Sequence, residues 1–68
     1  MFNFFAEENS RHGENYIISG SDYNHIKNVL RMKIGEALEI CDGNNKKYLC
    51  EIEEMTSEFV RAVIKEEL

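Results

Sequence analysis

The chain has 68 residues, with 8 Lys and Arg against 13 Asp and Glu, so its formal net charge is −5. This length allows one domain at most. Hydrophobic residues make up 43% of the chain, which is too large a share for a disordered protein. An acidic surface repels phosphate, so any nucleic-acid binding has to come from a local basic patch. With no membrane-spanning apolar run and no export signal in the sequence, we expect a cytoplasmic protein without membrane contact.

The N-terminal part is predicted to hold two short strands. Phe2–Ala6 is aromatic and apolar, and Tyr16–Ser19 contains two consecutive β-branched isoleucines, which are compositions typical of strands. The stretch ENSRHGEN at residues 8–15 is polar and contains a glycine, so we expect a loop there.

A helix is predicted over residues 22–31. Ser21 or Asp22 is suited to cap its N-terminus, because a short polar side chain can accept a hydrogen bond from the first free N–H groups. At about 100° per residue, four apolar side chains share one face of this helix. They are Tyr23, Ile26, Val29 and Leu30.

The remaining chain alternates between apolar strands and polar turns. We predict strands at Ala37–Cys41, Lys47–Glu54 and Phe59–Leu68, and a tight turn at DGNNK, residues 42–46. About five short strands and one helix favour a mainly β fold, because short strands need closure or a covering helix to protect their edges. The predicted architecture is a small antiparallel β-barrel that the helix plugs or caps.

The two cysteines, Cys41 and Cys50, flank the predicted turn. Their spacing, with His12 and His25, does not match a zinc site. Two interpretations stay open: a disulfide between facing strands, or two reduced thiols in apolar strand positions, which the scarcity of cytoplasmic disulfides favours.

The segment NHIKNVLRMKIG, residues 24–35, holds four basic residues and no acid. We call it the basic window. On the expected helix its side chains form a surface of hydrogen-bond donors that suits phosphate and base edges. The alternative to an RNA-binding surface is an ordinary solvent-exposed helix face. In that interpretation Arg31 complements the helix dipole, and His25 is a partly packed structural residue. The candidate RNA-binding residues are His25, Lys27, Asn28, Arg31 and Lys33.

No catalytic constellation is visible in the sequence. There is no nucleophile with a plausible base, and the four glycines stand singly rather than in a phosphate-binding loop. We therefore predict no catalytic, metal-binding or cofactor-binding residue in this chain.

Residues 22–52 resemble the N-terminal domain of the RsmE family, which methylates N3 of a uridine in small-subunit ribosomal RNA. The resemblance lies in a His followed after three residues by Val-Leu-Arg, which is His25 with Val29–Arg31, and in Gly35 and the Asp42-Gly43 turn. The opening FNFFAE is similar to that of the family, although Asn3 stands where the family commonly has Arg. If that Arg contacts RNA in the family, the contact is either missing here or supplied by Arg11.

The resemblance implies a PUA-like RNA-binding domain over residues 1–68. In the family, a second, trefoil-knotted SPOUT domain binds S-adenosylmethionine, carries the chemistry and forms the homodimer. The resemblance implies that this domain is absent here, so we expect no bound cofactor and no methyltransferase activity from this chain alone. By resemblance, His25 and Arg31 fall on the family's helix motif, whereas Lys27, Asn28 and Lys33 rest on the helix-face argument.

Three functions follow from these observations. The first is a domain that binds the ribosomal RNA substrate of a uridine-N3 methyltransferase. The second is a protein-docking module, in which the helix face or the end carrying Phe2 and Phe4 contacts the catalytic domain or a ribosomal protein. The third, a stand-alone enzyme, has no site in the sequence to support it.

Overall fold

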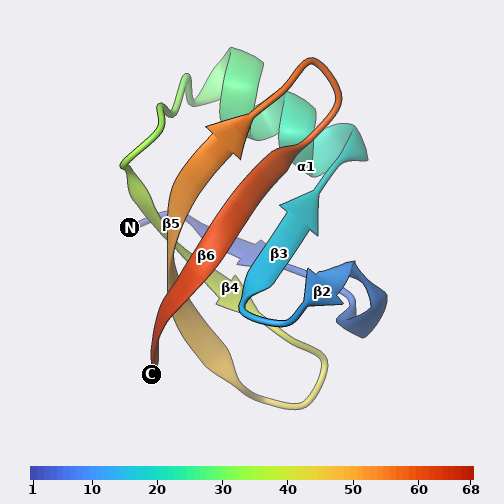
Figure 1. Cartoon of the computed structure of the whole chain (residues 1–68), viewed down its shortest axis with the longest axis vertical. Helices are drawn as coiled ribbons and strands as arrows, with labels where there is room; N and C mark the ends of the chain where they lie inside the picture. Colours follow the sequence, from blue (N-terminus) through green and yellow to red (C-terminus); the bar gives the residue numbers. More distant parts are fainter.

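The computed structural model describes the whole chain, residues 1–68, and shows a curled sheet with a short helical segment at one end (Figure 1). The strands are β1 (Asn3–Phe5), β2 (Arg11–His12), β3 (Asn15–Ile18), β4 (Ala37–Cys41), β5 (Lys47–Met55) and β6 (Val60–Glu67). The helical elements are a 3₁₀ turn η1 (Glu8–Ser10), the α-helix α1 (Gly20–Asn24) and a π-helical turn η2 (His25–Val29). The predicted mainly β class with one helical segment is confirmed.

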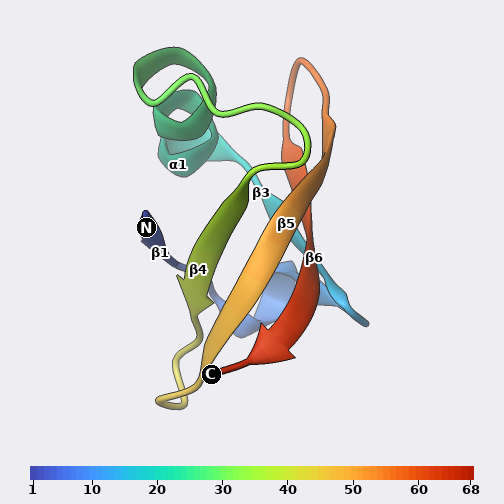
Figure 2. The same cartoon turned by 90° about the vertical axis from the view of Figure 1, so that its left-hand side faces the viewer.

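The sheet has six strands in the order β1-β4-β5-β6-β3-β2. The extra strand is β2, which forms a tight hairpin with β3 inside the region expected to be a loop. All neighbours pair antiparallel except β1, which runs parallel to β4, so the expectation of a wholly antiparallel barrel is wrong at this strand. Because β1 and β2 remain the two edges, the sheet is a half-barrel. The end of this half-barrel is covered by α1 and η2, which together form the helical segment, residues 20–29 (Figure 2).

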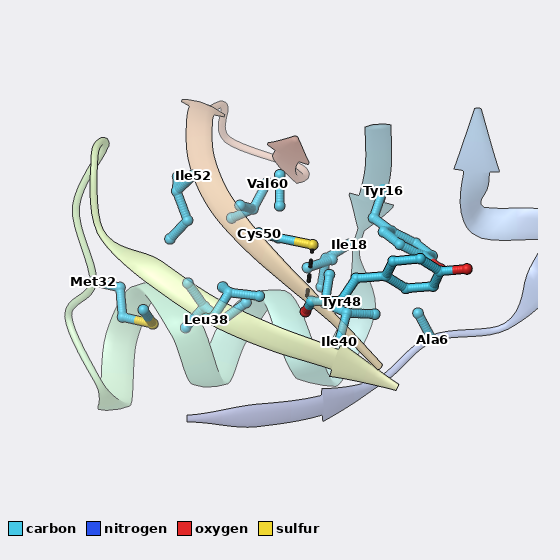
Figure 3. Close-up of a cluster of buried hydrophobic side chains, with 12 residues drawn as sticks. Ala6, Tyr16, Ile18, Met32, Leu38, Ile40, Tyr48, Cys50, Ile52 and Val60 are labelled. Carbon is cyan, nitrogen blue, oxygen red and sulfur yellow. Dashed lines mark hydrogen bonds between the residues drawn. The ribbon is translucent and has the colours of Figure 1, made fainter. Parts of the chain in front are cut away.

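The concave side of the sheet carries the core. The strand alternation predicts which side chains point inward, and on β5 these are Tyr48, Cys50 and Ile52, as expected. The rings of Tyr16 and Tyr48 lie side by side with centroids 6.2 Å apart (Figure 3). The full set of buried side chains is Ala6, Tyr16, Ile18, Ile26, Met32, Leu38, Ile40, Tyr48, Cys50, Ile52, Val60 and Ala62.

The helical segment differs from the prediction at both ends. It begins at Gly20, with Ser19 as the N-cap residue, and not after Ser21 or Asp22. From His25 the backbone widens into the π-helical turn, which ends at Val29, so Arg31 lies outside the helix. A π-helix has more residues per turn than an α-helix, which rotates the later side chains relative to an α-helical pattern. Val29 is consequently 61% exposed, although it was expected on the buried face.

Both cysteines are free thiols. The register places Cys41 opposite Lys47 and Cys50 opposite Leu38, so the two do not face each other across the β4–β5 hairpin. Cys50 is fully buried, and this burial raises the pKa of its thiol to about 11. None of the helical elements is long and apolar enough to cross a membrane.

Candidate nucleic-acid interface

The basic window covers η2 and the turn that leads to β4, on the outside of the molecule. Lys27, Arg31 and Lys33 are exposed and form no ion pair with any acid. Four cations elsewhere in the chain are different, because each of them pairs with at least one glutamate. They are Lys46, Lys47, Arg61 and Lys65. The remaining cation, Arg11 of β2, is partly buried and donates hydrogen bonds to the Gly13 oxygen and the Tyr48 hydroxyl. The lysine and arginine side chains that are both exposed and without a hydrogen-bond or ion-pair partner therefore lie in the window.

Lys27 is held on one side of the helical segment by an aromatic ring. Its ammonium lies 5.6 Å from the centroid of the Tyr23 ring, within the range of a cation–π contact. The Tyr23 hydroxyl donates a hydrogen bond to the backbone oxygen of Thr56 at 2.7 Å, which ties the helical segment to the turn between β5 and β6. Tyr23 thus positions both the helix and the lysine.

Two asparagines of the helical segment are exposed and bonded to each other. Asn28 Nδ2 donates to Asn24 Oδ1 at 2.7 Å, the spacing that one helical turn produces. This bond orients the amide of Asn28 and uses one of its two N–H groups, so the second N–H remains free to donate. Asn28 can therefore donate one hydrogen bond to a ligand while it keeps its bond to Asn24.

His25 lies next to β1, at the edge of the sheet. Its ring meets the Phe4 ring edge-to-face, with centroids 6.3 Å apart and an interplanar angle of 74°. The contact places Phe4 of β1 beside the window, although 21 residues separate the two in the sequence. His25 remains exposed, so its ring has a packed edge and a free edge.

Arg31 adopts a left-handed backbone conformation, with φ of 54°. It follows the last helical residues, and the Met32 N–H closes the helix end by donating to the Ile26 oxygen at 3.0 Å. Glycine is the usual residue at this position, because a left-handed conformation costs a residue with a side chain roughly 1–2 kcal/mol. The chain keeps an arginine there at the expense of stability.

Lys33 and Gly35 end the window at a tight turn. The Glu36 carboxylate accepts a hydrogen bond from the Lys33 backbone N–H at 3.1 Å, so the nearest acid is engaged with the backbone. Gly35, with φ of 95°, donates its N–H to the Ile52 oxygen at 2.8 Å. This bond anchors the turn on β5 and leaves the Lys33 ammonium exposed.

The five candidate residues are all exposed, and three of them have defined neighbours: His25 contacts Phe4, Lys27 contacts Tyr23 and Asn28 bonds to Asn24. Sequence reasoning missed the two aromatic side chains that position them, Tyr23 and Phe4. Tyr23 was assigned only to the apolar face, and the Phe4 contact is formed between distant segments. No group of three His, Cys, Asp or Glu side chains could hold a metal ion.

Comparison with known proteins places this geometry in context. The sequence model of RNA methyltransferase PUA domains matches residues 18–65, which include the whole basic window. A search of curated proteins finds no match.

Several solved structures share the fold. A putative methyltransferase from Legionella pneumophila, solved with its cofactor SAM, has a TM-score of 0.83 and 27% identity over 98% of this chain. A ribosomal RNA small subunit methyltransferase E from Neisseria gonorrhoeae, bound to S-adenosyl methionine, has a TM-score of 0.82 and 25% identity over 100%. A predicted RNA methyltransferase from Thermotoga maritima, at 22% identity and a TM-score of 0.83, shares the fold over 100% of this chain. The chain covers only 28%, 28% and 30% of these proteins, respectively.

Proposed function

The chain belongs to the family of RNA methyltransferase PUA domains, and from this premise we propose that it binds the ribosomal RNA substrate of a uridine-N3 methyltransferase. The observation that carries the proposal is the unpaired charge of Lys27, Arg31 and Lys33 in a segment without acids. On a chain with a net charge of −5, this segment is the surface to which a phosphate is attracted.

The donors in the window suit an RNA backbone. An arginine guanidinium binds phosphate with two parallel hydrogen bonds, a lysine acts as a mobile point charge, and the free N–H of Asn28 can reach a phosphate or a base edge. The acidic remainder of the surface repels RNA elsewhere, which confines binding to one face.

The specific reaction rests on the resemblance to the RsmE family and on the structural likeness to a small-subunit methyltransferase E. We propose that S-adenosylmethionine, the methyl transfer and dimer formation belong to a second domain outside these 68 residues. This chain would supply substrate affinity to that domain, because two linked binding sites hold one RNA more tightly than either does alone.

The test is an NMR titration of the 68-residue chain with a helix fragment of small-subunit ribosomal RNA, at low and at moderate salt. We expect amide shifts to cluster in residues 24–35 and to fade with salt. With about four phosphate contacts, the logarithm of the binding constant should fall with a slope of roughly −3 against the logarithm of salt concentration on single-stranded RNA. Shifts elsewhere, or a salt-independent affinity, would contradict the proposal.

Two alanine variants provide a matched comparison. Lys27→Ala removes an unpaired cation, and Lys65→Ala removes one that is paired with Glu51 and Glu53. Both variants change the net charge by the same amount. If the window binds RNA, only Lys27→Ala should weaken binding markedly. Equal weakening by both variants would show that RNA responds to the net charge of the protein and not to the position of the lysine.

A second candidate function is docking on another protein. It is favoured by exposed apolar side chains, which are Val29 at 61% and Ile34 at 64% exposure within the window and Phe2 at 48% near the N-terminus. An apolar docking surface keeps its affinity when salt is raised, so the salt series above separates it from RNA binding.

A further inference from the structure

A pocket of about 540 Å³ lies in the open seam of the half-barrel. Its walls include β1, which pairs only with β4, and the part of β3 beyond Tyr16, where pairing with β2 has ended. Residues of η1 and the first turn of α1 complete the lining. The volume falls within the roughly 300–1,000 Å³ that is typical of small-ligand sites.

The lining combines aromatic rings with carboxylates. The aromatic residues of the lining are Phe4 and Phe5, which point to opposite sides of β1, and the acids are Glu7 and Asp22. No hydrogen bond or ion pair of the side chains involves either carboxylate, and no Lys, Arg or His lines the pocket. An ionised carboxylate only accepts hydrogen bonds, so the pocket repels phosphate and favours a flat ligand that carries N–H donors.

The pocket adjoins the basic window through Phe4. The same ring that lines the pocket meets His25 edge-to-face, and Asp22 precedes His25 by three residues on the same helical segment. A single RNA strand can therefore place a phosphate on the window and turn the neighbouring base into the seam. Unpaired RNA bases are commonly bound in this manner, by stacking on aromatic side chains and by hydrogen bonds to the base edge.

We propose that the seam pocket binds one unpaired RNA base with an exocyclic amine, which is cytosine, adenine or guanine. The Phe4 ring offers the stacking surface, and the carboxylates of Glu7 and Asp22 accept hydrogen bonds from the amine. This inference rests on the proposed RNA-binding function and adds to it a preference for base type.

Uracil fits the pocket less well than the other bases. Its pairing edge presents two carbonyl oxygens around a single N–H, and those oxygens would face acceptors of the same sign. A loss of one hydrogen bond on this edge corresponds to about tenfold in affinity, or roughly 1.4 kcal/mol. The pocket is therefore expected to hold a base beside the target uridine rather than the uridine itself.

The experiment compares RNA pentamers that differ only at the central base, U-U-U-U-U against U-U-C-U-U and U-U-A-U-U. Affinity is measured by fluorescence anisotropy, and the methyl groups of Ile17 and Ile18, which line the pocket, are followed by NMR. We expect about tenfold tighter binding of the C and A pentamers, with methyl shifts that the U pentamer does not produce.

Two glutamine variants test the acid in the pocket. Glu7→Gln should reduce the preference for C and A, whereas Glu8→Gln, which changes a neighbouring acid outside the lining, should keep it. Asp22→Asn provides a second variant at the other carboxylate, and the amide spectrum of each variant checks that the fold is intact.

The outcomes separate this inference from the function on which it rests. If the pentamers shift the window but bind equally and leave the pocket methyls unchanged, the pocket assignment is overturned and RNA binding stands. If no RNA shifts either region, both are overturned. If a lysine-rich peptide shifts the pocket and RNA does not, the seam belongs to a protein partner and the base assignment is wrong.

Discussion

The outer face of β5 and β6 and the basic window are both rich in charge, but the charges are arranged differently. On the sheet, Arg61 contacts Glu53 and Glu54, and Lys65 lies near Glu51 and Glu53, so each cation shares its charge with acids on the neighbouring strand. In the window, Lys27, Arg31 and Lys33 have no acidic partner. Paired charges stabilise the fold slightly, whereas unpaired charges remain available to a ligand. The position of a lysine or arginine thus matters more than its number.

The largest expected effect comes from detaching the window from the sheet. Ile26 is the one fully buried side chain of the helical segment, so Ile26→Ala should lower the free energy of unfolding by roughly 2–5 kcal/mol. Hydrogen exchange should show earlier loss of protection in residues 20–29 than in β5. Val29→Ala, on the same turn but 61% exposed, is the control and should change stability little. Equal losses from both variants would show that the helical segment is not held by Ile26.

The next effect concerns the buried side of the sheet at alkaline pH. The pKa of the Cys50 thiol is raised by burial from its ordinary 9.0 to about 11. Between these values the unfolded thiol ionises while the folded one keeps its proton, so stability is retained below pH 9 and falls as pH rises to 11, by roughly 3 kcal/mol at most.

Urea unfolding at pH 8 and pH 10.5 measures this fall in stability. In Cys50→Ala the baseline stability is lower, but the part of the fall that belongs to the thiol should disappear. An unchanged pH dependence in the variant would assign the whole effect to other groups.

A smaller effect is expected at Arg31, where one substitution should raise stability and weaken RNA binding. Arg31→Gly relieves the left-handed backbone and should raise the free energy of unfolding by about 1 kcal/mol, while RNA binding weakens. Arg31→Ala keeps the strained backbone, so it should weaken binding without the gain in stability. Thermal unfolding and anisotropy together check both quantities. If Arg31→Gly binds RNA as tightly as the original chain, the role assigned to Arg31 is wrong.

The smallest effect is expected from the paired charges themselves. Arg61→Leu removes the contacts to Glu53, Glu54 and Asn15 and should cost less than about 1 kcal/mol, because half-exposed ion pairs contribute little. RNA affinity should stay nearly constant, in contrast to Lys27→Ala. A larger loss of affinity from Arg61→Leu would place the RNA on the sheet and reverse the comparison.

Local patterns in the sequence were enough to predict β4, β5 and β6. The alternation of Leu38 with Ile40, and of Tyr48 with Cys50 and Ile52, marks the buried face because the strand period is two. The two-residue β2 is too short for a pattern, and the parallel pairing of β1 joins segments distant in the chain. The π-helical turn depends on how the helix packs on the sheet, which explains the wrong placement of Val29.

The candidate site, too, could be predicted only in part. The absence of acids between Asn24 and Gly35 is visible in the sequence, so the five window residues could be selected before the structure was known. Their positioning could not, because the hydrogen bond from Tyr23 to Thr56 and the contact of Phe4 with His25 join distant segments. The seam pocket was not predicted either, since its lining comes from β1, η1, β3, α1 and β4.

The short edge strands have a consequence for association between molecules. A half-barrel leaves two free edges, and long, flat edges allow strands of separate molecules to pair and aggregate. Here β1 has three residues and β2 has two, which is too little backbone to template another strand. The sheet can therefore stay open along its seam while intermolecular strand pairing is discouraged at both edges.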